Sequence, residues 1–238
     1  MGIRTPRKKQ RVPLLSLLYR MHRLLPLSKR RKLKLYLDLE WIFDRLAMEM
    51  SFEHYPSADH PFRRKAREFL HSKVDRNMTV LDLGCKTGDV SFPLAGIVKE
   101  VVGVDHDGEA IATAQRTHQL PNLSFHHVEA LAYLNASEKK FDVLLLSHIL
   151  EHLDDPEAFL GMFKGHFTYI YIELPDFDKT YLNLYRADLG STLIYTDDDH
   201  ISEFDRDELK AVLTKCGIDV LESEYRFGVQ RLWCRVKR

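Results

Sequence analysis

After Asn77 the sequence alternates short apolar runs with longer stretches of helical pattern, and this alternation limits the fold more than any other feature. It is typical of a parallel β-sheet whose strands are joined by crossover helices. Runs such as residues 143–146 and 169–172 are continuously apolar, as in strands that are buried on both faces. The expected parallel strands are residues 79–82, 101–105, 123–128, 141–146 and 168–174.

The end of the chain departs from this alternation. Residues 218–226 and 229–236 are strand-like runs separated only by Phe227 and Gly228, as in an antiparallel hairpin. A chain of 238 residues, 45% of them hydrophobic, is long enough to bury one substantial core. We therefore predict an α/β fold with a doubly wound, seven-stranded, mostly parallel sheet in residues 59–238, preceded by N-terminal helices.

The N-terminal segment carries most of the asymmetry of charge. Residues 1–37 contain twelve Lys or Arg and no Asp or Glu, although the whole chain has a formal net charge of zero. Within residues 14–25, leucines recur at helical spacing with Arg20 and Arg23 between them, which predicts a basic amphipathic helix. Two more helical patterns follow, so we predict a basic helical arm and cap in residues 1–58.

Several roles suit this arm. It could lie on an anionic membrane surface, contact the phosphates of nucleic acid, act as a targeting segment, or simply pack its leucines on the main domain. Its serines are few for a targeting segment, so we rank membrane contact above targeting and nucleic acid lower. No apolar run approaches the roughly 20 residues that span a bilayer.

The three cysteines have neither metal-ligand spacing nor the density of a disulfide scaffold, which suits a reducing compartment. We expect a cytoplasmic protein, peripheral to the inner face of the membrane if the arm binds lipid.

A glycine-bearing turn follows the first strand, at the edge where open α/β sheets bind ligands. Gly84 and Gly88 let the backbone approach a ligand closely, and Asp82 can accept hydrogen bonds. Asp105 ends the next strand and can hydrogen-bond both hydroxyls of a ribose. A dinucleotide site would need the glycine spacing G-x-G-x-x-G or G-x-G-x-x-A, whereas this turn has the spacing Gly84-x-x-x-Gly88 with Lys86 at its middle position. NAD is therefore the weaker alternative.

Residues 81–88 and 102–105 together resemble motif I and the next acidic motif of class I S-adenosylmethionine-dependent methyltransferases, which have a Rossmann-like sheet. Lys86 stands where that family most often has glycine. The resemblance implies S-adenosylmethionine as cofactor, with its methionine part near residues 82–88 and its ribose at Asp105. The adenine would lie beside residues 106–107 and Glu129, which follow the strands at 101–105 and 123–128. The implied cofactor-binding residues are Asp82, Gly84, Gly88, Asp105, His106, Asp107, Glu129, Ala130 and Ser147.

A polar cluster follows the strand expected at residues 141–146. His148 and His152 are one helical turn apart and would share a face, and Glu151 could orient one of them. Methyl transfer to oxygen requires the acceptor hydroxyl to lose its proton, and neutral histidine is a suitable base near pH 7. His200 lies in a segment, residues 196–204, that resembles the loop over the acceptor in this family. The catalytic candidates are therefore His148, Glu151, His152 and His200.

These four residues also resemble the metal site of RNA 3′-end methyltransferases and some quinone methyltransferases, which have Glu where His148 stands. One divalent ion is an alternative that we favour less than metal-free catalysis.

By resemblance, the leading hypothesis is an enzyme that methylates a hydroxyl of a sugar, glycolipid or secondary metabolite, with a small-molecule or glycan acceptor from polysaccharide biosynthesis. The alternatives are a metal-assisted RNA or quinone methyltransferase and a non-catalytic, cofactor-binding scaffold.

Overall fold

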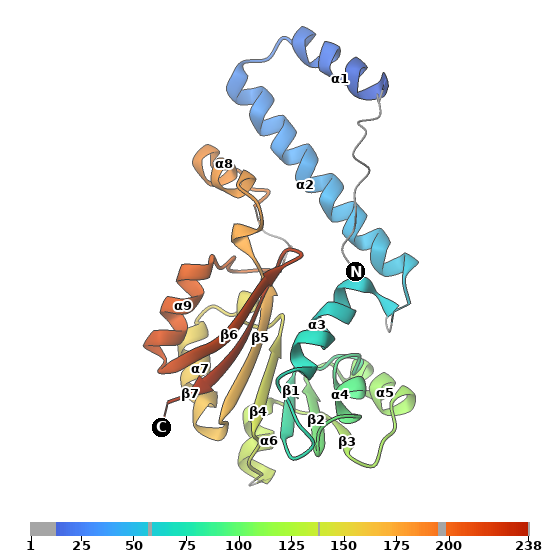
Figure 1. The fold of residues 1–238 in the computed structure, drawn as a ribbon, viewed down its shortest axis with the longest axis vertical. Coiled ribbons are helices and arrows are strands. Elements are labelled where there is room, and N and C mark those ends of the chain that lie inside the picture. Colours follow the sequence, from blue (N-terminus) through green and yellow to red (C-terminus); the bar gives the residue numbers. More distant parts are fainter. Residues whose placement is uncertain (1–12, 57–58, 138, 195–198, 238) are drawn as a thin grey trace.

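A computed structural model describes residues 13–56, 59–137, 139–194 and 199–237. The centre of the molecule is a seven-stranded sheet (Figure 1). The strand order is β3-β2-β1-β4-β5-β7-β6. The first five strands are parallel, β7 runs antiparallel to β5, and β6 pairs antiparallel with β7. The predicted doubly wound sheet with its C-terminal antiparallel hairpin is confirmed. The strands are β1 (Thr79–Leu83), β2 (Glu100–Asp105), β3 (Leu123–His127), β4 (Val143–Ser147), β5 (Tyr169–Pro175), β6 (Ile218–Arg226) and β7 (Val229–Val236).

Apolar side chains project from both faces of this sheet and are buried on both, as the continuous apolar runs predicted. Along β4, Leu144 and Leu146 pack with α6 (Ala130–Ser137), α7 (Pro156–Phe163) and α9 (Arg206–Lys215). Val143 and Leu145 point to the opposite face and pack with α3 (Pro61–His71) and α4 (Ser91–Ala95). Helix α5 (Gly108–Thr117) closes a smaller cluster beside β3. Short helical turns complete the fold at η2 (Leu150–His152), η3 (Lys164–His166) and η4 (Phe177–Lys179).

Strand β4 begins two residues later than predicted, and Asp142, which precedes it, hydrogen-bonds the first residue of β1. Its carboxylate accepts hydrogen bonds from the backbone N–H and the hydroxyl of Thr79, at 2.8 and 2.9 Å. Asp142 thereby fastens the start of β1 beside β4. The five parallel strands β1 to β5 all end at the same edge of the sheet.

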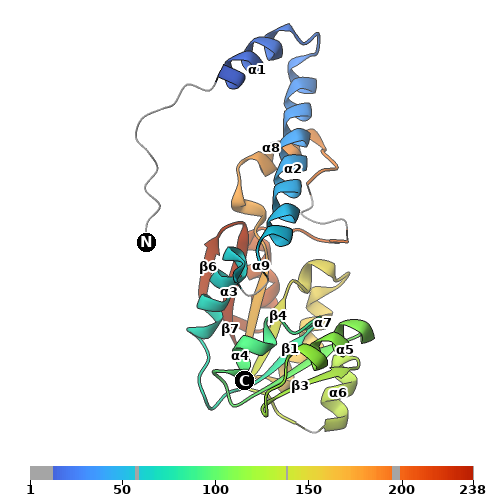
Figure 2. The same ribbon diagram turned by 90° about the vertical axis from the view of Figure 1, so that its right-hand side faces the viewer.

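The N-terminal arm consists of α1 (Pro13–Leu24) and α2 (Lys29–His54), and it projects away from the sheet (Figures 1 and 2). Helix α2 packs against α8 (Leu182–Leu189). Arg186 of α8 is buried and donates to the carbonyl of Leu37 at 3.0 Å and to the carboxylate of Glu40. This contact joins the arm to the segment that follows β5.

Helix α1 buries none of its residues, so the alternative in which its leucines pack on the main domain is not observed among the described residues. Residues 1–12, which hold five of the twelve basic residues of the arm, lie outside the described residues. Among the helices that the structure describes, none combines the length and apolar character needed to cross a membrane.

Candidate active site

The turn after β1 passes through three residues of positive φ: Gly84 (73°), Lys86 (46°) and Gly88 (82°). It is fastened to the end of β2, because the N–H of Gly84 donates to the carbonyl of Val104 at 2.9 Å and the N–H of Lys86 donates to Asp105 Oδ2 at 2.8 Å. A left-handed conformation costs a non-glycine residue about 1–2 kcal/mol. Lys86 therefore strains the turn, while its side chain lies in solvent.

The two glycines of this turn meet different neighbours. A Cβ at Gly88 would lie 2.5 Å from Cζ of Phe125, so packing against the core requires glycine at this position. A Cβ at Gly84 would lie 2.5 Å from Cδ1 of Ile149, in the loop after β4. Gly84 therefore adjoins the polar cluster that follows β4.

Asp82 lies beneath the turn and is 2% exposed. Its carboxylate accepts a hydrogen bond from the hydroxyl of Ser91. Burial raises the pKa of Asp82 to about 7, although the Ser91 hydrogen bond opposes the shift. Asp82 is thus buried and hydrogen-bonded to Ser91, and its predicted contact with the methionine part of the cofactor stays a prediction.

At the end of β2, both oxygens of Asp105 accept a backbone N–H at 2.8 Å, Oδ2 from Lys86 and Oδ1 from Asp107. These bonds orient the carboxylate, which retains lone pairs for further donors. Asp107 is the N-cap of α5 and accepts two N–H groups of its first turn, at 2.9 and 3.1 Å. The helix therefore accounts for Asp107 without a ligand, whereas the side chain of His106 is exposed to solvent.

The remaining cofactor candidates lie at neighbouring strand ends. The N–H of Val128 donates to the carbonyl of Asp105 at 3.1 Å, which brings the end of β3 beside that of β2. Glu129 is exposed, Ala130 is buried at the start of α6, and Ser147 ends β4 half-buried. The fold thus gathers the nine candidates at the ends of β1 to β4, and their roles toward a cofactor stay predictions.

His148 stands between two carboxylates. Its Nδ1 lies 2.9 Å from Glu151 Oε1 and its Nε2 lies 3.6 Å from Glu173 Oε1. Burial lowers the pKa of His148, but the two carboxylates outweigh it and raise the pKa to about 10. Nδ1 is within hydrogen-bond distance of Glu151 and Nε2 is within ion-pair distance of Glu173, so the surroundings favour the protonated imidazole rather than the neutral base that the sequence suggested.

His148 also lies outside the helical turn. Its φ is 56° and its N–H donates to the carbonyl of Glu173 at 2.8 Å, while only residues 150–152 form the 3₁₀ turn η2. The prediction that His148 and His152 share a helical face is therefore wrong. His152 instead faces His200, at a distance of 4.8 Å between ring centroids.

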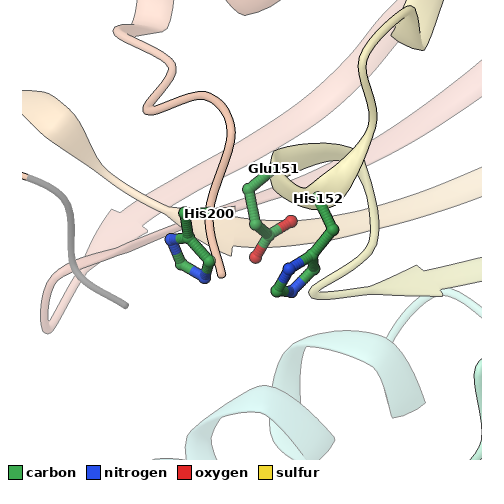
Figure 3. A group of neighbouring side chains, drawn as sticks. All are labelled: Glu151, His152 and His200. Atoms are coloured by element: carbon green, nitrogen blue, oxygen red, sulfur yellow. The ribbon is translucent and has the colours of Figure 1, made fainter. Parts of the chain in front are cut away.

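Figure 3 shows the side chains of Glu151, His152 and His200 converging. One ligand atom of each lies within 4.8 Å of the others. Glu151 is fully buried, and its Oε2 has no hydrogen-bond partner among the described residues. The carbonyl of Glu151 accepts the N–H groups of Ile201 and Ser202 at 2.9 and 3.1 Å, which brings His200 to η2. Residues 196–198 of the predicted acceptor loop lie outside the described residues.

The partners of the two histidines define their tautomers. His152 Nδ1 lies 3.2 Å from the carbonyl oxygen of Asp199, and His200 Nδ1 lies 2.9 Å from Glu203 Oε1. Both partners only accept hydrogen bonds, so each Nδ1 acts as a donor toward its partner. Histidines held in this way suit divalent metal ions, which also bind carboxylates such as Glu151. The buried, unsatisfied Glu151 Oε2 fits a cation, and these three residues would hold it.

A buried network of charged residues lies behind His148 and was not predicted from the sequence. Glu173 accepts a hydrogen bond from Tyr171 at 2.7 Å and pairs with Arg231 Nε at 2.6 Å. Arg231 is fully buried and also pairs with Glu224 at 3.0 Å. Although burial opposes it, His148 and Arg231 lower the pKa of Glu173 to about 2. The sequence offered one signal of this network, because Glu173 and Arg231 are charged residues inside the apolar strand runs 169–175 and 229–236.

The chain is similar to known methyltransferases. A family model described as a methyltransferase domain matches residues 52–223. The chain is 32% identical over 85 residues to a ubiquinone biosynthesis O-methyltransferase of Pelagibacter ubique, a match that covers 36% of this chain and 35% of the relative. It is 30% identical over 123 residues to a protein of the same name from Cereibacter sphaeroides, covering 51% of this chain and 44% of the relative. The matches thus span less than half the length of these curated relatives.

Solved structures share the fold. The N-methyltransferase NodS from Bradyrhizobium japonicum, in complex with S-adenosyl-L-homocysteine, superposes with a TM-score of 0.56 at 18% identity, over 76% of this chain and 90% of that one. Magnesium protoporphyrin IX methyltransferase from Synechocystis superposes with a TM-score of 0.55 at 18% identity, over 72% of this chain and 80% of that one. Because the family model covers most of the chain and the sheet has the same architecture, the protein belongs to the methyltransferase domain family.

Proposed function

We propose that the protein transfers the methyl group of S-adenosylmethionine to a hydroxyl of a quinone-type aromatic ring. The observation that carries this proposal is the cluster of Glu151, His152 and His200, in which the buried carboxylate of Glu151 lies near two histidines and its Oε2 has no hydrogen-bond partner among the described residues. Support for the cofactor comes from the family and from the S-adenosyl-L-homocysteine bound to NodS. Support for the acceptor comes from the curated relatives named for ubiquinone biosynthesis. These relatives do not support the sugar or glycolipid acceptor and the polysaccharide pathway expected from the sequence.

In the proposed reaction, the acceptor oxygen attacks the methyl carbon, the carbon–sulfur bond breaks, and S-adenosyl-L-homocysteine leaves with the electron pair on sulfur. The hydroxyl proton goes to a base, for which we propose Nε2 of His152, because Nδ1 of this ring donates to the carbonyl of Asp199. His148, protonated and held by Glu151 and Glu173, would orient Glu151 rather than remove a proton. One divalent ion held by Glu151, His152 and His200 would lower the pKa of a bound hydroxyl.

The first experiment is calorimetric titration with S-adenosylmethionine, with NAD as the control, followed by turnover on a prenylated catechol with a hexose for comparison. We expect saturable binding of S-adenosylmethionine, and methylation of the catechol that a chelator suppresses and added Mg²⁺ or Zn²⁺ restores. Binding without turnover on any acceptor would favour the scaffold alternative, and turnover only on RNA 3′ ends would favour the RNA alternative.

Variants of the cluster sharpen this test. Glu151→Gln and His200→Gln should retain cofactor binding and lower turnover by about 10²- to 10⁴-fold, as expected for the loss of proton transfer or metal binding. His54→Gln, at an exposed histidine of α2, is the matched control and should turn over like the parent protein. Full activity of the Glu151 variant would contradict the proposed site.

A further inference from the structure

We propose that α1 binds the surface of an anionic phospholipid membrane, with its apolar face among the acyl chains and the basic residues around it at the headgroups. This inference concerns the arm and does not depend on which acceptor the enzyme methylates.

The apolar face of α1 has no partner within the described chain. No residue of α1 is buried, and Leu17, Met21 and Leu24 are 53%, 55% and 82% exposed. With Leu14 and Leu18, which are 63% and 51% exposed, they recur every three or four residues and therefore form one continuous stripe. An exposed aliphatic stripe of this kind on a helix with basic neighbours is typical of helices that lie in the plane of a membrane surface.

The charges around this stripe all have one sign. Residues 13–37 contain seven basic residues and no acidic one: Arg20, Arg23, Lys29, Arg30, Arg31, Lys32 and Lys34. Within the part of the chain that the structure describes, Arg30 and Lys32 donate to backbone carbonyls and none of the seven forms an ion pair with a carboxylate. Clusters of this size next to an amphipathic helix are attracted to anionic lipid headgroups.

The rest of the molecule carries the opposite charge, since the chain beyond residue 37 has 23 Lys or Arg against 35 Asp or Glu. An anionic surface would repel that part and attract only the arm. The charge distribution thus gives the molecule one orientation on such a surface.

The arm has the geometry for this orientation. Helix α1 lies at the end of α2 that is farthest from the sheet (Figures 1 and 2). The buried Arg186 fixes α2 to α8, and α8 follows β5 beyond the strand ends where the candidate active site lies. A membrane bound by α1 would therefore face the active-site end of the sheet. If the proposed quinone-type acceptor is correct, it would reach the enzyme from that side.

Two other partners explain the surface less well. Nucleic acid would neutralise the basic residues but would leave the aliphatic stripe of α1 in water. A second copy of the chain could cover the stripe but would bring two clusters of positive charge together. A membrane surface accounts for both features.

The test is sedimentation of the full-length protein with vesicles of phosphatidylcholine, either alone or mixed with phosphatidylglycerol. We expect binding to the mixed vesicles only, and weaker binding at high salt because exposed charges are screened. The triple variant Leu17→Gln, Met21→Gln and Leu24→Gln should lose binding. The triple variant Lys29→Gln, Arg31→Gln and Lys34→Gln should bind on the order of 100-fold more weakly, since each basic residue near the surface contributes about 1 kcal/mol.

The control variants carry substitutions of the same kinds elsewhere on the surface, two at exposed apolar residues and three at exposed basic residues. Met162→Gln with Leu221→Gln, and Arg76→Gln with Lys99→Gln and Lys210→Gln, should bind vesicles like the parent protein. All four variants should keep the parent's helix content and its turnover on a water-soluble catechol, so a failure of membrane binding is distinguishable from a failure of the proposed function.

Three outcomes would overturn the inference. The first is equal vesicle binding by the parent protein and the apolar-face variant. The second is no vesicle binding, together with binding of an RNA duplex that the basic variant loses. The third is a lipid-free dimer that the apolar-face variant dissociates.

Discussion

At the scale of single residues, the site depends on how buried charges are balanced. Glu173 is 4% exposed and lies between His148 and Arg231, and the latter is fully buried. Removing one partner of a buried pair leaves an uncompensated charge, which is typically destabilising by about 3–5 kcal/mol. Glu173 thus supports both the position of His148 and the packing of β5 against β7.

Glu173→Gln should therefore lower the free energy of unfolding by about 3–5 kcal/mol, as measured by urea denaturation. Glu224→Gln is the matched control, because Glu224 also pairs with Arg231 but its side chain is 25% exposed. We expect the control to lose no more than about 1 kcal/mol. Equal losses in the two variants would contradict the role assigned to burial.

Asp82 gives a second prediction at this scale, in the pH dependence of stability. Its folded pKa of about 7 lies above the ordinary value of 3.8, so the folded state favours the protonated carboxyl. Its contribution to stability is fully present below about pH 4 and is lost as the pH rises through about 7.

Asp82→Asn removes this titration. At pH 8 the variant should exceed the parent in free energy of unfolding by an amount on the order of a few kcal/mol, and at pH 4 the two should differ little. Denaturant titrations at both pH values measure the difference, with the exposed Asp154→Asn as the control. A difference that is independent of pH would argue against a raised pKa.

At the scale of elements, the turn after β1 is shaped by the packing beneath it. Gly88 has a φ of 82° and sits against the ring of Phe125, whereas a Cβ on Gly165 would meet nothing within 4 Å. The left-handed conformation and the close contact both oppose a side chain at Gly88.

Gly88→Ala should consequently destabilise the protein by about 1–3 kcal/mol, the range for overpacking of a well-filled core. Gly165→Ala should be within about 0.5 kcal/mol of the parent. Thermal unfolding of the two variants gives the comparison, and a neutral Gly88→Ala would show that the turn can move away from Phe125.

At the scale of the whole molecule, one arginine joins the arm to the enzyme domain. Arg186 is 2% exposed and contacts the backbone of Leu37 as well as Glu40 across the α2–α8 contact. Arg186→Leu should therefore accelerate amide hydrogen exchange in α2 while leaving β1, β4 and β5 protected. Lys139→Leu, at the exposed ion pair with Glu100, is the control and should leave exchange in α2 unchanged. Faster exchange throughout the sheet would indicate a general loss of stability instead.

Apolar periodicity predicted the sheet and its antiparallel end, because such periodicity is a local pattern. The resemblance of residues 81–88 and 102–105 to known motifs indicated the family, which the family model confirms. The side-chain chemistry of the sequence also indicated His148, Glu151, His152 and His200 as catalytic candidates, and their catalytic roles stay predictions. Only the tertiary structure decided that His148 pairs with Glu151 and Glu173 and that His152 faces His200. Those contacts join residues from β5, the 3₁₀ turn after β4 and a loop about fifty residues later. The physical reason is that electrostatic pairing acts through distance in space, which the folding of the whole chain sets and local sequence patterns do not.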